Sequence, residues 1–354
     1  LDFLAGMLKD AVAKVKSEEN PDVLNQIKKI YKKEGHMELK MFEPIKFSKF
    51  ELKNRIVMSP MITVDADEKL AKIHDFHNVH YGARALGGVG LIMLEATGVS
   101  SEGRITDKDL GLWNEEQAEA LKGLVELLHY LGSKVGVQLN HAGRKSNAGQ
   151  RLIAPSAISY DESSKTPEKM SLEDINYIVN CFSNSAKFVQ ESGADIIELH
   201  IAHGYLLNQF ISPLTNKRDD EYGGSLKNRY RIIKRVITEV KKVFTGVLWA
   251  RISADEYDIN GNKPKDFIQF AKWLKEDGIE LIDVSSGGIT NKVPQHIYPA
   301  YQVPLATMIK RGADIKVSAV GLLNSPQLVE SILQSGQADM VSLGRPLLSN
   351  PNWL

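Results

Sequence analysis

Two histidines and a tyrosine within six residues form the group in this sequence whose types and spacing point most directly to chemistry. His200, His203 and Tyr205 follow a largely apolar run at residues 196–199 that is typical of a buried strand. In α/β enzymes the reactive side chains gather where such strands end. Two hydrogen-bond donors beside a proton donor suit a reaction that polarises a carbonyl group and protonates the carbon next to it.

Glycine-rich strand ends in the last quarter of the chain indicate a phosphate site. Gly287, Gly321 and Gly344 each follow a short apolar run, and Arg345 follows the last of them. Glycine lets backbone N–H groups approach a phosphate closely, and arginine supplies positive charge. Each glycine alone is also typical of a tight turn, but together they predict a phosphorylated cofactor or substrate.

Other polar residues have structural alternatives. Arg251 lies inside an apolar run, and because a buried charge is costly unless it is paired, we expect it to meet an anion, with a structural salt bridge as the alternative. The three-residue spacing of His200 and His203 is not a zinc spacing and no third ligand is obvious, so we expect no metal. The acidic run at residues 219–221 is expected to be architectural, as a loop before a helix.

The elements that would position these residues alternate along the chain. Short apolar runs are separated by amphipathic helical stretches, one of which starts at residue 171 with a Ser171–Asp174 capping pattern. Several helices are expected to end at a glycine that precedes an acidic residue and the next strand, as at Gly193, Gly278 and Gly312. The apolar runs lie at residues 55–59, 89–95, 134–139, 196–200, 247–252, 281–285, 315–319 and 340–343.

Eight such strand–helix units predict an α/β fold, a (β/α)8 TIM barrel, because right-handed βαβ repetition closes after eight strands. A doubly wound open sheet is the alternative, but no Gly-x-Gly-x-x-Gly follows an early strand. Helical spacing of apolar residues before residue 36 predicts an added N-terminal helical segment. We therefore expect two parts, a helical extension at residues 1–36 and a barrel at residues 37–354 that stops before its last helix.

Composition excludes several classes of protein. The 354 residues are 43% hydrophobic, and 44 basic residues balance 44 acidic ones, so nothing predicts binding to nucleic acid or to a membrane surface. The single cysteine, Cys181, excludes an internal disulfide framework and a cluster held by several thiolates. A reducing cytoplasmic setting is expected, and we identify neither a secretory signal nor a membrane span.

A family resemblance covers about residues 41 to 352. The segment from His200 to Arg231 is similar to the signature of the Old Yellow Enzyme family, the FMN-dependent ene-reductases. Within this family, the sequence most resembles the bacterial subgroup first known from a Bacillus enzyme. The other matching motifs follow in family order at residues 53–61, 88–96, 103–106, 138–145, 154–157 and 343–345.

The resemblance implies roles for individual residues. His200 and His203 would bind the substrate carbonyl oxygen, and Tyr205 would be the proton donor. Gln138 would bond the pyrimidine edge of the flavin, and Arg251 would lie near its N1 and C2 carbonyl. The residues implied to line or hold FMN are Ser59, Pro60, Met61, Ile62, Ala96, Gln138, Arg251, Gly287, Gly321, Gly344 and Arg345.

The resemblance also implies the reaction and its partners. NAD(P)H would reduce FMN, and the reduced flavin would then reduce the C=C bond of an α,β-unsaturated carbonyl compound in the same pocket. A cytoplasmic homo-oligomer is expected. Two positions depart from the family pattern: Ile62 stands where Cys or Thr is usual, and Val64 stands where Tyr is common. These two residues leave the flavin potential and the substrate preference open.

Three other functions are compatible with the sequence. One is oxidative dehydrogenation or demethylation of a small metabolite on the same flavin-binding barrel. Another is a lyase or aldolase that binds a phosphorylated substrate without flavin, although the sequence offers no clear Schiff-base lysine at a strand end. The third is an FMN-binding interaction module, against which the intact His200, His203 and Tyr205 argue.

Overall fold

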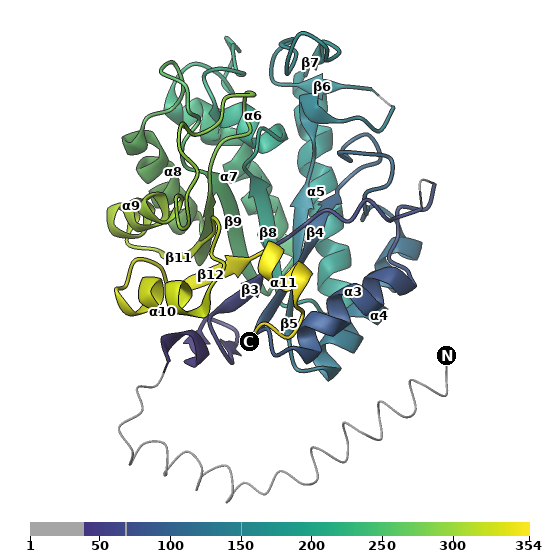
Figure 1. Ribbon diagram of the computed structural model, residues 1–354. Coiled ribbons are helices and arrows are strands. Elements are labelled where there is room, and N and C mark those ends of the chain that lie inside the picture. Colours follow the sequence, from purple (N-terminus) through teal and green to yellow (C-terminus); the bar gives the residue numbers. More distant parts are fainter. Residues whose placement is uncertain (1–38, 68, 150) are drawn as a thin grey trace, which may run out of the picture. The chain divides into compact units, whose positions relative to one another are not determined.

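The computed structural model describes residues 39–67, 69–149 and 151–354 (Figure 1). The predicted helical extension at residues 1–36, and with it the predicted division of the chain, lies outside the described residues. Residues 40–354 form one compact unit. The strands are β1 (Ile45–Lys46), β2 (Glu51–Leu52), β3 (Ile56–Met58), β4 (Leu91–Gly98), β5 (Lys134–Asn140), β6 (Ile153–Ala154), β7 (Glu168–Lys169), β8 (Ile196–Ile201), β9 (Val247–Ser253), β10 (Leu281–Ser285), β11 (Lys316–Ala319) and β12 (Met340–Leu343).

Helices alternate with the longer strands and surround them in Figure 1. The helices are α3 (Asp75–Leu86), α4 (Glu115–Tyr130), α5 (Leu172–Ser192), α6 (Leu206–Ile211), α7 (Leu226–Val243), α8 (Pro264–Asp277), α9 (Val303–Ala313), α10 (Pro326–Gln334) and α11 (Arg345–Ser349), with short 3-10 turns η1 (Lys40–Phe42) and η2 (Gly143–Lys145).

Eight parallel strands close into a barrel, which confirms the predicted fold. Their order around the barrel is the order of the chain, β3, β4, β5, β8, β9, β10, β11 and β12, and β12 pairs with β3 to close it. Every residue of β4, β8 and β9 is buried. A parallel strand covered by helices on one side and by the barrel interior on the other reads as a continuous apolar run, which is why the sequence locates these strands well.

Helix ends follow the expected capping chemistry with one exception. Ser171 and Asp174 form the predicted capping box of α5, and Gly193 and Gly278 end their helices in the left-handed conformation. The expectation for Gly312 is wrong, because this residue lies within α9 and the left-handed position is Asp314. Aspartate tolerates that conformation better than most residues with a side chain, so the helix continues for one residue past Gly312.

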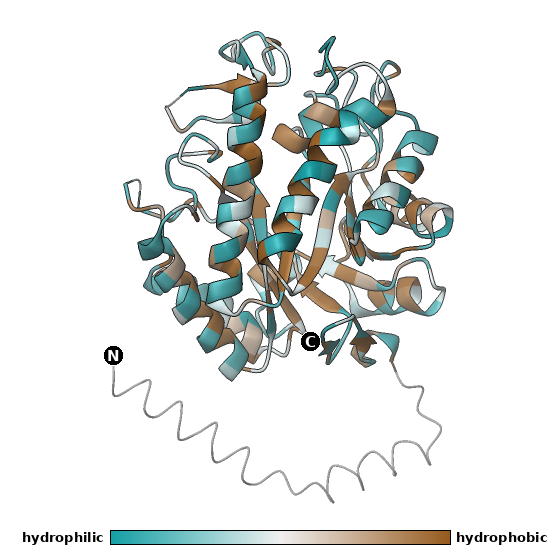
Figure 2. Ribbon diagram, turned by 180° about the vertical axis from the view of Figure 1, so that it is seen from behind, coloured by the Kyte–Doolittle hydropathy of each residue, from teal (hydrophilic) through white to brown (hydrophobic). Residues whose placement is uncertain are grey.

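The barrel interior is apolar at the end where the strands begin. Inward-facing Val57, Met93, Ile196 and Trp249 pack together there with the β1–β2 hairpin, whose Leu52 is fully buried. A larger apolar cluster lies between the strands and the surrounding helices. Figure 2 shows the same division, with brown strands behind helices whose ribbons alternate between teal and brown. The hairpin thus closes one end of the barrel and leaves the other end for the site.

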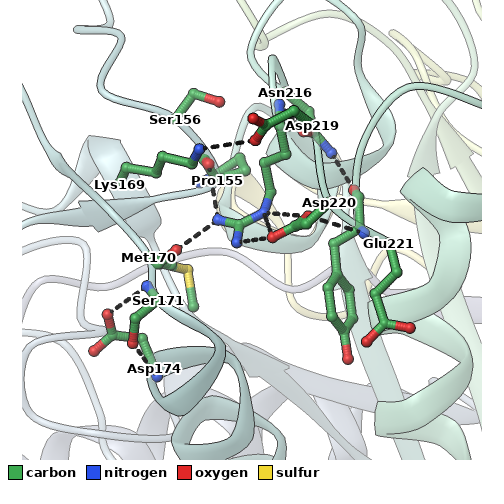
Figure 3. Close-up of polar contacts among 12 residues, drawn as sticks. Pro155, Ser156, Lys169, Met170, Ser171, Asp174, Asn216, Asp219, Asp220 and Glu221 are labelled. Atoms are coloured by element: carbon green, nitrogen blue, oxygen red, sulfur yellow. Dashed lines mark hydrogen bonds and ion pairs between the residues drawn. The ribbon is translucent and has the colours of Figure 1, made fainter.

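The acidic run at residues 219–221 is architectural, as predicted. The buried Arg218 guanidinium forms an ion pair with Asp220 and donates to the carbonyl oxygens of Pro155 and Met170, at 3.1 and 2.6 Å (Figure 3). These bonds tie the loop after α6 to the small β6–β7 sheet. Helix α7 then begins after its N-cap residue Ser225.

None of the helices within the described residues is long and apolar enough to cross a membrane.

Candidate active site

The carboxyl end of β8 brings the two histidines and the tyrosine together. The ring centres of His200 and His203 are 5.2 Å apart, and those of His200 and Tyr205 are 4.8 Å apart, both edge to face. Gly204 lies between them with φ +74°, and a Cβ atom there would come within 2.1 Å of the Gly288 carbonyl oxygen. Only glycine allows this close approach, so it fixes the loop that carries all three side chains.

Both histidines are neutral and hydrogen-bonded. Burial, more than the neighbouring positive charges, holds the pKa of His200 and of His203 well below the ordinary value. The Ala202 N–H donates to His200 Nδ1 at 3.2 Å, which places the His200 proton on Nε2. His203 Nε2 lies 2.7 Å from the Ser285 hydroxyl, and its backbone N–H donates to Ser253 Oγ at 2.9 Å. The position of His203 is therefore set from β9 and β10, and the orientation of the His200 ring is set by the backbone of Ala202.

Lys145 is a charged neighbour of Tyr205. Its ammonium group donates to the carbonyl oxygens of His203 and Gly288, at 2.9 and 3.2 Å, and lies 5.2 Å from the centre of the Tyr205 ring. Burial lowers the pKa of Lys145 to about 8, and the charge of Arg144 adds to this effect. Burial raises the pKa of Tyr205 to about 12, so the phenol keeps its proton at neutral pH.

A buried polar layer lies inside the barrel, two residues further along the strands than the apolar layer. Arg251 Nε is 3.3 Å from Asp283 Oδ2 of the neighbouring strand β10, so the structure shows the alternative, a salt bridge within the protein. The geometry is that of an ion pair without a good hydrogen bond, because this Nε is buried and has no hydrogen-bond partner among the described residues. Burial raises the pKa of Asp283, and the charge of Arg251 opposes that rise.

Gln138 belongs to the same layer. Its Nε2 donates to Glu198 Oε1 at 2.8 Å across the β5–β8 pair. Burial raises the pKa of Glu198, and the nearby negative charge of Asp283 adds to the rise. Because Glu198 accepts a hydrogen bond from the amide N–H, the Gln138 carbonyl oxygen is turned away from this carboxyl and can accept a hydrogen bond from a ligand.

A cavity of about 250 Å³ lies at the ends of β10, β11 and β12. His203 lies at its boundary, and so does Ser59 from the end of β3. Of the predicted phosphate residues, Gly321, Gly344 and Arg345 line it. Its other lining residues are Ser285, Ser286, Tyr301, Gln302, Val320, Leu322, Leu323, Asn324, Ser342, Leu343 and Pro346.

Gly287 is placed differently from the other predicted glycines. Its N–H donates to the Asp255 carbonyl oxygen at 2.8 Å, and Ser285 and Ser286, not Gly287, line the cavity. The N–H groups of Gly321 and Gly344, in contrast, donate to no other described residue. A ligand in this cavity would therefore find two uncommitted backbone donors.

The donor set fits FMN. A Cβ atom at Gly321, where φ is +117°, would lie 3.2 Å from the Gln302 side chain, so glycine keeps the cavity open at that point. The exposed Arg345 forms no ion pair with any described carboxylate and stands at the cavity rim. Uncommitted N–H groups and a guanidinium suit a phosphate, while Gln138 and Arg251 offer the polar contacts that a flavin ring requires.

The loop after β3 carries the remaining predicted flavin residues. The Ser59 N–H donates to the Leu343 carbonyl oxygen at 3.0 Å, and a Cβ atom on Gly344 would lie 3.2 Å from Met61 Sδ. Pro60, Met61 and Ile62 are half-buried. Ala96 is buried in β4, directly after a shift in the pairing of β4 with β5. The loop after β3 therefore reaches Gly344, one of the predicted phosphate-binding glycines.

The structure adds residues that the sequence reasoning did not assign. Lys145, Ser285, Glu198 and Asp283 contact predicted site residues, and Glu95 supports the loop after β3. For Lys145 a signal was present, because it ends the matched motif at residues 138–145. The carboxylates sit in apolar strands, where an acidic residue already indicates an interior polar partner. Among the described residues no cluster of three or more His, Cys, Asp or Glu side chains could hold a metal ion.

Comparison with known proteins identifies two matching families along the chain. Residues 40–354 match the model of the NADH:flavin oxidoreductase / NADH oxidase family. Residues 2–38 match a family of unknown function (DUF8520).

Two bacterial relatives illustrate the similarity. An NADPH dehydrogenase of Geobacillus sp. (strain WCH70) is 48% identical over 319 residues, which cover 90% of this chain and 93% of the relative. An NADPH dehydrogenase of Halalkalibacterium halodurans is 50% identical over 317 residues, with the same coverage of 90% and 93%.

Solved structures agree with the sequence relatives. Morphinone reductase superposes with a TM-score of 0.79 at 26% identity, and the match covers 90% of this chain and 88% of the morphinone reductase chain. The old yellow enzyme homologue from Zymomonas mobilis gives a TM-score of 0.76 at 27% identity, covering 88% of this chain and 90% of its own.

Proposed function

Because this chain belongs to the NADH:flavin oxidoreductase / NADH oxidase family, the Old Yellow Enzyme family, we propose that it reduces the C=C bond of α,β-unsaturated carbonyl compounds. It is an FMN oxidoreductase of the NADPH dehydrogenase type. The observation that carries the finer proposal is the joint placement of His200, His203 and Tyr205 on one fixed loop at the end of β8.

The residues proposed to hold FMN lie on both sides of the barrel mouth. The N–H groups of Gly321 and Gly344 and the guanidinium of Arg345 would bind the phosphate. The Gln138 amide oxygen would accept a hydrogen bond from the ring N3–H, and Arg251 would donate one to the C2 carbonyl.

The wall of the flavin site on the side of β3 and β4 would consist of Ser59, Pro60, Met61, Ile62 and Ala96. Gly287 would contribute only space at the end of β10, because its N–H is already bonded. When bound, FMN supplies the hydride chemistry by accepting a hydride from NADPH and passing it to the substrate.

The substrate oxygen would be held by the two neutral imidazoles. His200 carries its proton on Nε2 and can donate it. The Ser285 hydroxyl can donate to His203 Nε2, which leaves the second imidazole proton on Nδ1 for the same oxygen. Two preorganised donors stabilise the negative charge that develops on the carbonyl oxygen while the C=C bond is reduced.

Tyr205 would supply the proton. Its pKa of about 12 keeps the hydroxyl protonated at neutral pH, and its ring lies against His200, close to where the carbonyl would be held. Transfer from Oη to the carbon beside the carbonyl leaves a tyrosinate, which the Lys145 ammonium, 5.2 Å from the ring centre, would stabilise.

The test is a stoichiometric reduction under nitrogen. Purified protein reconstituted with FMN receives NADPH and 2-cyclohexen-1-one, and NADPH consumption is compared with cyclohexanone formation. The proposal predicts one cyclohexanone for each NADPH and no turnover of 2-cyclohexen-1-ol, which has the same C=C bond but lacks the carbonyl group. NADPH oxidation that occurs only in parallel samples in air, with several enones left unreduced, would contradict it.

A further inference from the structure

A buried glutamate lies behind the loop that follows β3, outside the residues assigned to FMN or substrate. Glu95 is in β4, where the register with β5 shifts between Leu94 and Ala96, so a β-bulge is centred on this residue. Its side chain is fully buried. Bulges re-aim side chains and are frequent beside active sites, and here the bulge turns a carboxyl toward the loop.

The Glu95 carboxyl joins β4 to the loop through Thr63. The Thr63 N–H donates to Oε2 at 2.9 Å, and the Thr63 hydroxyl donates to Oε1 at 3.0 Å. From α3, the Tyr81 hydroxyl donates to Oε1 at 3.0 Å and accepts the Glu95 backbone N–H at 3.1 Å. We call Glu95, Thr63 and Tyr81 the clamp; it ties together β4, α3 and the loop after β3.

His77 lies next to the clamp but is not its counterion. Its Nε2 is 3.9 Å from Glu95 Oε1, too far for a hydrogen bond, and 3.5 Å from the Thr63 hydroxyl. Burial lowers the pKa of His77 to about 4 and raises that of Glu95 to about 7, so burial favours the neutral form of each. The carboxyl is therefore held by hydrogen bonds, not by a salt bridge.

The residue after Thr63 is strained. Val64 has φ +55°, a left-handed conformation that is unfavourable for a β-branched side chain. Such a conformation persists only where the surroundings enforce it. Both the N–H and the hydroxyl of the preceding residue are fixed by Glu95, which supplies that enforcement.

We propose that Glu95 is a positioning residue that, through Thr63, holds Met61 and Ile62 in place as the wall of the flavin site. This inference rests on the proposed function, because it takes residues 59–62 and Ala96 as that wall. Consecutive Cα atoms are about 3.8 Å apart, so fixing the Thr63 backbone fixes Ile62 within one residue. Ala96 is bonded directly to Glu95, so one side chain sets both parts of the wall.

The test compares two clamp variants with a matched control. Glu95→Gln keeps the size of the side chain but places an NH2 group against a donor, and Thr63→Val removes only the hydroxyl. Asp195→Asn is the control, because Asp195 is a largely buried carboxylate that accepts the Val135 N–H at 2.9 Å at the opposite end of the barrel. The readouts are the FMN dissociation constant of the apoprotein, the visible spectrum and the midpoint potential of the bound flavin, and the melting temperature.

The inference expects Glu95→Gln to weaken FMN binding by about tenfold or more and to shift the flavin spectrum and potential, since the NH2 group of glutamine cannot accept a hydrogen bond from Thr63 or Tyr81. Thr63→Val should move the same readouts in the same direction by less. Asp195→Asn should lower the melting temperature but leave the FMN dissociation constant, the flavin spectrum and the midpoint potential unchanged. If Glu95→Gln behaves like Asp195→Asn, Glu95 is merely structural and the inference is wrong; if it does not fold, Thr63→Val decides by the same readouts.

Failure of the inference is distinguishable from failure of the proposed function. A wild-type protein that binds FMN but ignores enones overturns the proposed reaction, while the clamp is still decided by FMN affinity, spectrum and potential. A wild-type protein that takes up no FMN overturns both. A wild-type protein that reduces enones, with clamp variants that bind FMN unchanged, overturns only the inference.

Discussion

Replacing Glu95 by glutamine should change how the stability of the protein depends on pH. Burial raises the pKa of the Glu95 carboxyl from 4.5 to about 7, against the hydrogen bonds from Thr63 and Tyr81. A carboxyl whose pKa is higher in the folded state is favoured there in its protonated form. Its contribution to stability is therefore fully present below pH 4.5 and is lost as the pH rises through about 7.

The size of the effect follows from the shift. A difference of about 2.5 pKa units at about 1.4 kcal/mol each amounts to about 3 kcal/mol in total, of which about 2–3 kcal/mol falls between pH 5 and pH 8. Glutamine does not ionise, so the Glu95→Gln variant escapes this loss. Its free energy of unfolding minus that of the wild type should thus increase by that amount from pH 5 to pH 8.

The assay is urea denaturation of both FMN-loaded proteins at pH 5 and at pH 8, at one FMN concentration. Groups common to both proteins, such as His77, cancel in the difference, and the contribution of FMN is subtracted by measuring the dissociation constant of each protein at both pH values. Asp174→Asn is the control, because Asp174 pairs with Arg151, which stays charged, and the lowered pKa of Asp174 keeps it ionised throughout this range, so a constant difference is predicted. A constant difference for Glu95→Gln as well would refute the reasoning.

Three further outcomes are expected. Tyr205→Phe should slow reduction of 2-cyclohexen-1-one by roughly 10²-fold or more while leaving flavin reduction by NADPH nearly unchanged, and equal slowing of both phases in stopped-flow traces would remove Tyr205 as proton donor. Arg345→Ala should weaken FMN binding by about tenfold or more, measured by fluorescence titration, and unchanged affinity would remove the arginine from the phosphate site. Val64→Gly should keep or raise the melting temperature because it relieves the left-handed strain. The control, Val293→Gly at an exposed loop valine without positive φ, should lower the melting temperature, and an equal loss for both would argue against strain at Val64.

The sequence predicts the barrel well because its strands are buried on both faces. The runs at residues 281–285 and 340–343 match β10 and β12 at both ends. Strand β4 is predicted less well, because it continues to Gly98, past the predicted end at residue 95. A glutamate reads as the end of an apolar run, and only the clamp from Thr63 and Tyr81 explains how it stays inside the strand.

The site is predictable in part. His200, His203 and Tyr205 are close in sequence, so their proximity in space follows from one strand end. The partners of Gln138 and Arg251 do not follow, because Glu198 and Asp283 come from other strands and meet them only when the barrel closes. The sequence also predicts that Gly287 binds phosphate, but its N–H donates to a carbonyl oxygen in the loop after β9, a contact that the sequence does not reveal.

The most direct test of the central claim is the visible spectrum of the purified protein through one cycle. Without air, the account predicts a yellow protein that is bleached by NADPH and regains its colour when 2-cyclohexen-1-one is added. A colourless protein that takes up no FMN would contradict the flavin site, and a bleached protein that the enone leaves bleached would contradict the proposed reaction.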